Sequence, residues 1–165
     1  MNSPVIVVEY NEEWPAIYER ERQLIASVLG ETIIAIEHVG STAVVGLSAK
    51  PIIDLMLVVE RLEPGEVYAR YLETLGYLFV ADAGSSDRHF FKKGESRNHH
   101  LHLVEEGSQE HRRLIAFRDY LRAHPETRQE YEALKKALAL QFRFEREAYT
   151  KAKTEFVRSI EARTL

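Results

Sequence analysis

The residues best suited to chemistry lie close together in the first third of the chain. Gly40 and Ser41 form a small-residue turn, where the backbone can approach a bulky anion and a hydroxyl can donate to a phosphate. Lys50 follows this segment and is held extended by the proline after it, so its ammonium can reach a phosphate as a point charge. Asp54 interrupts an apolar run, and a buried carboxylate is costly unless it is paired or binds a metal. This order predicts a phosphate pocket beside a carboxylate.

Three histidines are candidates for the same pocket. His38 precedes Gly40 by two residues, so it is a candidate base or ligand, or else a buried histidine bonded to a backbone carbonyl. His100 and His102 are two residues apart, so on a strand they share one face. Two such imidazoles suit Zn²⁺, Mn²⁺ or Ni²⁺, and the alternatives are core histidines or phosphate donors. If their strand lies beside that of Asp54, the three residues form one metal site.

Further basic and aromatic residues extend this hypothesis. Arg88 and Lys92 share a strand face and are candidate phosphate ligands, whereas the alternative is a solvated edge that resists strand pairing. Tyr149 and Lys153 are four residues apart and share a helix face. They would close the pocket over a base or phosphate, but the interpretation we favour is a packed tyrosine with a lysine that extends to solvent.

The segment from His38 to Leu55 resembles the GrpB family, whose pattern is close to His-Val-Gly-Ser-Thr-x-x-x-Gly-Leu-x-Ala-Lys-Pro-Ile-Ile-Asp. The sequence departs from that pattern at Val45, where a proline is expected. The resemblance covers nearly the whole chain, and it includes Val8–Asn11 with Trp14-Pro15, Leu101–Leu103, Phe117–Arg122 and Tyr149–Lys153. GrpB proteins are in turn similar to the nucleotidyltransferase superfamily, which places Asp-x-Asp on a strand after Gly-Ser. The family is also found fused to dephospho-coenzyme A kinase in some bacteria.

The resemblance implies an α+β fold with a nucleotidyltransferase-like mixed sheet and a C-terminal helical segment. We expect one domain over residues 1–165, with an α/β core over about 1–107 and helices over about 108–165. The superfamily's second carboxylate would stand at Met56, and a thioether cannot hold Mg²⁺. On a strand Met56 shares the face of Asp54, so we expect its side chain to protrude into the pocket. This departure argues against ordinary Mg²⁺-dependent nucleotidyl transfer. Asp54 then either keeps a metal role or is a structural carboxylate that caps a helix or pairs with a lysine.

The function expected from these residues is binding of a nucleotide or phosphorylated small molecule, with nucleotidyl transfer to a small acceptor as the candidate reaction. In this hypothesis Asp54 and His38 are catalytic, and a divalent metal (Mg²⁺, Mn²⁺ or Zn²⁺) is held by Asp54, His100 and His102. The phosphate ligands would be Gly40, Ser41, Lys50, Arg88 and Lys92. One alternative is a catalytically degenerate partner module, for example of a dephospho-coenzyme A kinase. Another is a histidine-dependent metal hydrolase.

Composition limits the remaining function classes. The formal charge of −4 and the pI near 6.0 make a long nucleic acid an improbable partner. The absence of cysteine excludes a thiolate nucleophile, a disulfide framework and Cys-ligated zinc. No apolar run approaches the ~20 residues that span a bilayer, and the N-terminus does not resemble a signal peptide. We therefore expect a soluble cytoplasmic protein.

Periodicity predicts the elements that must position the site. An extended arm should precede a helix that begins near Glu12 and ends at Gly30. We expect strands over 32–39, 52–59, 77–81, 88–93 and 98–104, a loop or short helix over 41–48, and a helix over 64–75. Beyond Gly107, apolar residues at helical spacing predict three helices.

Overall fold

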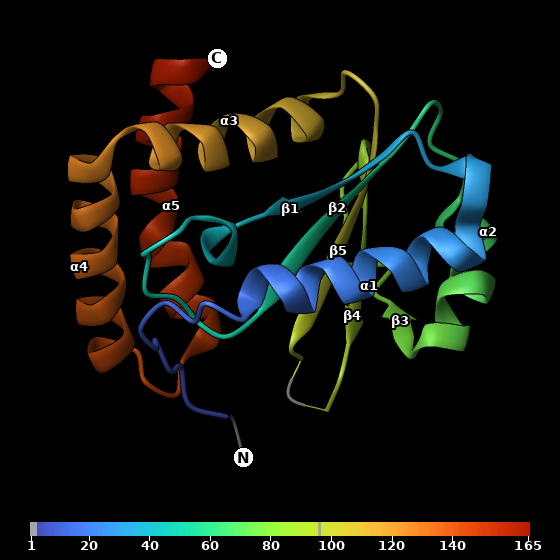
Figure 1. The fold of residues 1–165 in the computed structure, drawn as a ribbon. Coiled ribbons are helices and arrows are strands. Elements are labelled where there is room, and N and C mark those ends of the chain that lie inside the picture. Colours follow the sequence, from blue (N-terminus) through green and yellow to red (C-terminus); the bar gives the residue numbers. More distant parts are fainter. Residues whose placement is uncertain (1–2, 96) are drawn as a thin grey trace.

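The computed structural model describes residues 3–95 and 97–165, and it contains one five-stranded mixed sheet (Figure 1). The strand order is β1-β2-β5-β4-β3. Strands β2 and β5 are parallel, and the other neighbours are antiparallel. The bounds are β1 Ala35–Val39, β2 Ile53–Val59, β3 Tyr77–Phe79, β4 Arg88–Lys93 and β5 His99–Glu105. This architecture confirms the expected α+β class.

Five α-helices accompany the sheet, and they are α1 Trp14–Leu29, α2 Gly65–Leu72, α3 Gln109–Ala123, α4 Pro125–Gln141 and α5 Arg146–Thr164. Short 3₁₀ turns cover Gly30–Thr32, Ser41–Ala43 and Glu73–Leu75. The first of these turns delays β1, which was expected from Thr32. In Figure 1, α3 runs above β1 while α4 and α5 lie at the left of the sheet, and these are the three helices that the periodicity predicted after Gly107. Within the described ranges, no helix is long and apolar enough to cross a membrane.

One face of the sheet carries the main core. Alternate residues of β2, beginning with Ile53, point to this face because strand side chains have a period of two. They pack with Leu101 and Leu103 of β5 under α1 and α2. Trp14 and Ile25 of α1 are almost fully buried in this cluster. The continuous apolar sequence of β2 follows from burial on both faces.

The opposite face of β2 begins with Asp54 and continues with Met56 and Val58. Met56 is fully buried and belongs to a cluster with Val58 against which Leu114 and Ile115 of α3 pack. The expectation that Met56 shares a face with Asp54 is therefore confirmed. Its expected protrusion into the pocket is wrong, because α3 covers it with apolar side chains.

A buried carboxylate fixes α1 to the far half of the sheet. Glu21 of α1 is 5% exposed and accepts hydrogen bonds from Tyr77 of β3 at 2.9 Å and from Lys93 of β4 at 2.7 Å. His99 Nε2 of β5 lies 3.8 Å from the same carboxyl group. Burial, together with the charge of Glu21, raises the pKa of Tyr77 above its ordinary range. One acid thus joins one helix to three strands.

Replacing Glu21 by Ala should lower the free energy of unfolding by about 3 kcal/mol, because removing one partner leaves a largely buried ammonium at Lys93 unpaired. Denaturant unfolding would measure the loss. The matched control is Glu19→Ala, which removes an exposed α1 carboxylate that contacts Arg22 and Gln23 of its own helix and should change little. Equal losses in the two variants would contradict a structural role for Glu21.

Candidate functional site

Asp54 lies on β2, next to the strand β5 that carries His100 and His102, as the sequence hypothesis requires. Its Cα pairs with His100 of β5, and the next same-face residue of β5 is His102. The Asp54 Oδ1 atom lies 3.0 Å from His102 Nε2 and 3.7 Å from His100 Nδ1. The expected meeting of this carboxylate with both histidines is therefore present in the structure.

The two oxygens of Asp54 face different surroundings. Oδ1 is engaged by His102, whereas Oδ2 faces the turn at Gly40, where a Cβ would lie only 2.5 Å away. Gly40 has φ 74° and ψ −173°, a backbone region that is almost exclusive to glycine. Burial alone would raise the pKa of Asp54, but the His102 hydrogen bond and nearby positive charge, which includes Lys50, outweigh it and lower the pKa. Asp54 is thus a charged carboxylate at neutral pH.

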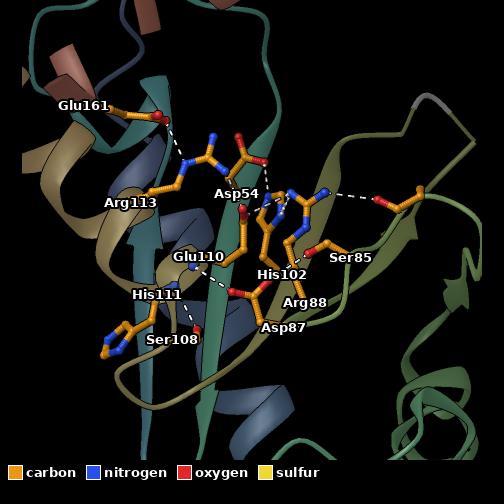
Figure 2. A network of polar contacts seen from close by, with 11 residues as sticks. Asp54, Ser85, Asp87, Arg88, His102, Ser108, Glu110, His111, Arg113 and Glu161 are labelled. Carbon is orange, nitrogen blue, oxygen red and sulfur yellow. Dashed lines mark hydrogen bonds and ion pairs between the residues drawn. The ribbon is translucent and has the colours of Figure 1, made fainter. Parts of the chain in front are cut away.

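His102 stands between Asp54 and a chain of ion pairs (Figure 2). Its Nδ1 lies 3.4 Å from an amino group of Arg88. Because a guanidinium only donates, this Nδ1 is the accepting nitrogen and Nε2–H donates to Asp54. Arg88 also donates to the Ala83 carbonyl at 3.1 Å and lies 3.8 Å from Glu110 of α3. Figure 2 continues this chain from Glu110 through Arg113 to Glu161 of α5.

Two lysines meet beside Asp54 without a carboxylate in contact. Lys50 Nζ lies 5.0 Å and Lys153 Nζ 4.4 Å from the centre of the Tyr149 ring. Within residues 3–95 and 97–165, neither ammonium has a carboxylate within 4.0 Å. Burial lowers the pKa of Lys50, as does Arg146, while Asp54 acts against this. Burial and the Lys50 charge lower the pKa of Lys153 to about 7.

Lys135 of α4 is a third amine in this region. It is 2% exposed, its Nζ donates to the Ser48 carbonyl at 2.5 Å, and it lies 4.7 Å from the Tyr131 ring centre. Burial and the neighbouring Lys153 charge lower the pKa of Lys135 to about 7. The sequence interpretation missed Lys135, whose only signal was a lysine in an apolar helix face. It also favoured a solvent-directed Lys153, whereas this side chain is half-buried beside Lys50.

Hydroxyl groups line the same region. Burial raises the pKa of Tyr131 above its ordinary range, and a hydrogen bond with Ser41 opposes that effect. Tyr149 is fully buried, and burial raises its pKa to about 12. Among the described buried side chains, its hydroxyl is one of two polar groups that have no hydrogen-bond partner. The other is Arg88 Nε. An unsatisfied buried hydroxyl carries a free-energy penalty that a bound polar ligand would remove.

Helix α3 holds the turn that carries Gly40 and Ser41. Arg118 donates to the His38 carbonyl at 3.1 Å, and Arg122 donates to the Ala43 carbonyl at 3.0 and 2.8 Å. Two arginines of the motif Phe117–Arg122 therefore hold the turn by hydrogen bonds to the backbone on either side of it. The sequence marked this motif as family-like but gave no reason for it.

Helix α4 holds the second half of the β1–β2 connection. Glu132 accepts a hydrogen bond from the Ser48 backbone N–H at 2.8 Å, and Lys135 donates to the carbonyl of the same residue. Ser48 precedes Lys50 by two residues, so these two hydrogen bonds to the Ser48 backbone help to fix the backbone position of Lys50.

His38 does not share the face of Asp54. In the β1–β2 register His38 opposes Leu55, whereas Val39 opposes Asp54. The His38 ring stacks on Tyr18 of α1 at 4.7 Å, and its Nε2 lies 3.0 Å from the Thr42 hydroxyl. Burial lowers the pKa of His38 to about 4. Strand alternation thus turns the His38 ring toward α1, and a catalytic role for His38 stays a prediction.

The remaining phosphate candidates are placed as follows. Gly40 lies against Asp54, and Lys50 is near enough to Asp54 to influence its pKa, whereas Arg88 is engaged by His102 and Ala83. Lys92 opposes His100 on the sheet face that carries Asp54 and is half-buried. The phosphate roles of Arg88 and Lys92 stay predictions.

The donor set does not fit a two-metal Mg²⁺ site. Asp54 is a single carboxylate, and the next same-face position is the buried thioether of Met56. Among the described residues, no three His, Asp or Glu side chains converge so as to hold a metal ion. Burial lowers the pKa of His100 to about 4, so its imidazole is neutral at pH 7. Binding of one transition-metal ion by Asp54 and a histidine stays a prediction.

Comparison with known proteins identifies the family. A family model described as "GrpB protein" matches residues 4–163. The chain belongs to the GrpB family. The UPF0157 protein YqkA of Bacillus subtilis is 37% identical over 158 residues, which are 95% of this chain and 46% of that protein. The GrpB chain thus spans about half the length of this curated relative.

Solved structures confirm the fold of the GrpB chain. The crystal structure of conserved protein GrpB from Enterococcus faecalis has a TM-score of 0.90 and 37% identity, and the match covers 96% of both chains. The MgGTP-bound Cid1 poly(U) polymerase has a TM-score of 0.53 and 12% identity, over 81% of this chain and 44% of that one. The dUTP-bound terminal uridylyl transferase 4 of Trypanosoma brucei has a TM-score of 0.53 and 13% identity, over 81% and 46%. GrpB therefore shares a nucleotidyltransferase-like fold.

A dephospho-CoA kinase of Mycolicibacterium paratuberculosis is also similar to this GrpB chain. It is 25% identical over 182 residues, which are 94% of this chain and 45% of the kinase. Nearly the whole chain therefore has a counterpart in a longer protein of that name.

The close approach at Gly40 gives a testable expectation. Gly40→Ala should lower the free energy of unfolding and displace Asp54, because the new Cβ would meet Oδ2 and the backbone has a positive φ. Gly46→Ala is the matched control, since Gly46 also has a positive φ of 84° but nothing within 4 Å of a Cβ. Chemical denaturation should show Gly40→Ala to be the more destabilised by about 1–3 kcal/mol. Equal losses would mean that the contact with Asp54 has no energetic weight.

Proposed function

We propose that this GrpB protein binds the phosphate groups of a nucleotide or another phosphorylated small molecule beside Asp54. One observation carries the proposal: Lys50 and Lys153 converge over Tyr149 with no carboxylate in contact among the described residues. Two ammonium groups largely withdrawn from water, with the Asp54 carboxylate nearby but not in contact, are energetically unfavourable, and a bound phosphate relieves that penalty. The shared fold with nucleotide-bound polymerases supports the choice of ligand.

Each residue has a distinct role in this proposal. Lys50 and Lys153 neutralise phosphate charge, and the Ser41 hydroxyl and the turn at Gly40 contact the phosphate from the side of β1. Asp54 presents Oδ2 to the same space, while His102 holds Oδ1. A carboxylate there orients an acceptor hydroxyl by accepting its hydrogen bond, which is positioning catalysis for in-line attack on phosphorus.

The packing of Met56 favours a second candidate, a catalytically degenerate binding module. The position that would carry a second carboxylate is filled by a thioether buried under α3, so oxygen ligands are lacking on one side of the reacting phosphate. The similarity to a dephospho-CoA kinase supports a role as a partner module in this candidate. In both candidates phosphate binding persists, and only the turnover differs.

Loss of either lysine should weaken phosphate binding. We expect Lys50→Met and Lys153→Met each to reduce tripolyphosphate affinity by about tenfold or more, the value of one charge-assisted hydrogen bond. Isothermal titration calorimetry measures the affinity, with Lys151→Met on the exposed side of α5 as the matched control. Unchanged affinity in both pocket variants, or absence of binding to the wild type, would refute the proposed function.

The affinity for an anion should depend on pH because the pKa of Lys153 is lowered to about 7. Sulfate keeps its two charges across the neutral range, so its binding reports the protein alone. Below about pH 7 the amine is already protonated and affinity is greatest; above it, binding must add a proton, and affinity falls by up to about tenfold per pH unit. Lys153→Arg, which stays charged, should flatten this profile. Sulfate affinity that varies identically with pH in the wild type and in Lys153→Arg would contradict the assignment of this pH dependence to Lys153.

The metal and turnover expectations are tested together. Wild-type protein with Mg²⁺ and nucleoside triphosphates should show weak or undetectable transfer, because Met56 supplies no oxygen ligand. Any Mn²⁺ or Zn²⁺ binding should disappear in Asp54→Asn and in His102→Ala, as calorimetry would show.

Met56→Asp should destabilise the fold, since it buries a carboxylate among apolar side chains. Robust Mg²⁺-dependent turnover by the wild type would refute the degenerate module.

A further inference from the structure

The three lysines of this region, Lys50, Lys135 and Lys153, differ in burial and in the contacts of their ammonium groups. Lys135 is 2% exposed and its Nζ is bonded to a backbone carbonyl, so it can neither reach a ligand nor react. Lys50 and Lys153 are half-buried, and among the described residues the contact found for each ammonium is the Tyr149 ring. Two half-buried amines therefore lie close to the same aromatic ring.

The charged and titratable groups around Lys153 are unbalanced toward positive charge. Its own helix contributes Tyr149, α4 contributes Lys135, the β1–β2 connection contributes Lys50, and β2 contributes Asp54. The carboxylate of Asp54 is already committed to His102. A lysine desolvated beside another cation releases its proton near neutrality, which is the condition for a nucleophilic amine. The pKa of about 7 for Lys153 agrees with this geometry.

We propose that Lys153 is a nucleophilic lysine that forms an imine with a phosphorylated aldehyde held in this pocket. The inference rests on the proposed phosphate site and names a ligand class for it. Lys50 holds the phosphate, which brings the carbonyl carbon of the same molecule to the neighbouring amine.

The covalent step balances without a further reactant. The lone pair of Lys153 Nζ forms the C–N bond as the carbonyl π bond opens, and a proton moves from nitrogen to oxygen to give a carbinolamine. Loss of one water molecule then gives the imine. Added borohydride would donate a hydride to the imine carbon, while nitrogen takes a proton from water, and the adduct becomes permanent.

Trapping with pyridoxal 5′-phosphate and borohydride at about pH 7 tests the proposal, with peptide mass spectrometry to locate the adduct. We expect labelling of Lys153 to exceed that of exposed Lys151 by about tenfold or more, because a lysine of ordinary pKa is almost fully protonated there. Pyridoxal without phosphate should label Lys153 less, and excess tripolyphosphate should protect it. Lys153→Arg should abolish this adduct while tripolyphosphate still binds, which separates the amine from its charge.

Two outcomes distinguish the failures. Adducts spread over exposed lysines or concentrated on Lys50, together with normal tripolyphosphate binding, overturn the nucleophilic Lys153 and leave the proposed function standing. Labelling of Lys153 that pyridoxal matches and tripolyphosphate does not reduce overturns the phosphate-anchored ligand and the proposed function with it. Circular dichroism of Lys153→Arg confirms that loss of the adduct does not reflect unfolding.

Discussion

The arrangement of this protein depends on how charges withdrawn from water are compensated around the β1–β2 connection. Asp54 is supported by His102, and Lys135 by the Ser48 carbonyl, so these two are satisfied within the chain. Lys50 and Lys153 are not, because the surface they share is an aromatic ring. Desolvated ammonium groups of like sign destabilise the folded state unless an anion joins them or one proton leaves. The proposed phosphate site and the proposed nucleophilic amine both rest on this one imbalance.

The C-terminal helices are part of the site. Helix α3 supplies the arginines that grip the Gly40 turn, α4 supplies the pair that grips Ser48, and α5 brings Lys153 to Lys50. Because both halves of the connection are held by hydrogen bonds to backbone groups, its position is determined by side chains more than 70 residues away in sequence. Preorganisation of this kind reduces the entropy lost when a ligand binds.

Met56 packs in the apolar contact between β2 and α3, at the position where a two-metal transferase would need a carboxylate. Its replacement by a carboxylate would therefore disturb the fold and the site together. The Arg88–Glu110–Arg113–Glu161 chain reaches His102 along the same side of the sheet and keeps that imidazole directed at Asp54. Stability and site geometry are therefore coupled along this face.

The amino-acid sequence by itself determined the family, the order of the elements and the meeting of Asp54 with His100 and His102. Strand alternation and the apolar period are local properties, and they place these side chains once the two strands pair. Tertiary structure alone decided the rest. It turned His38 toward α1, engaged Arg88 with His102, and brought Lys135 and Lys153 to Lys50. These outcomes depend on register and on helix packing between distant segments, where desolvation and neighbouring charges arise only after the chain has folded.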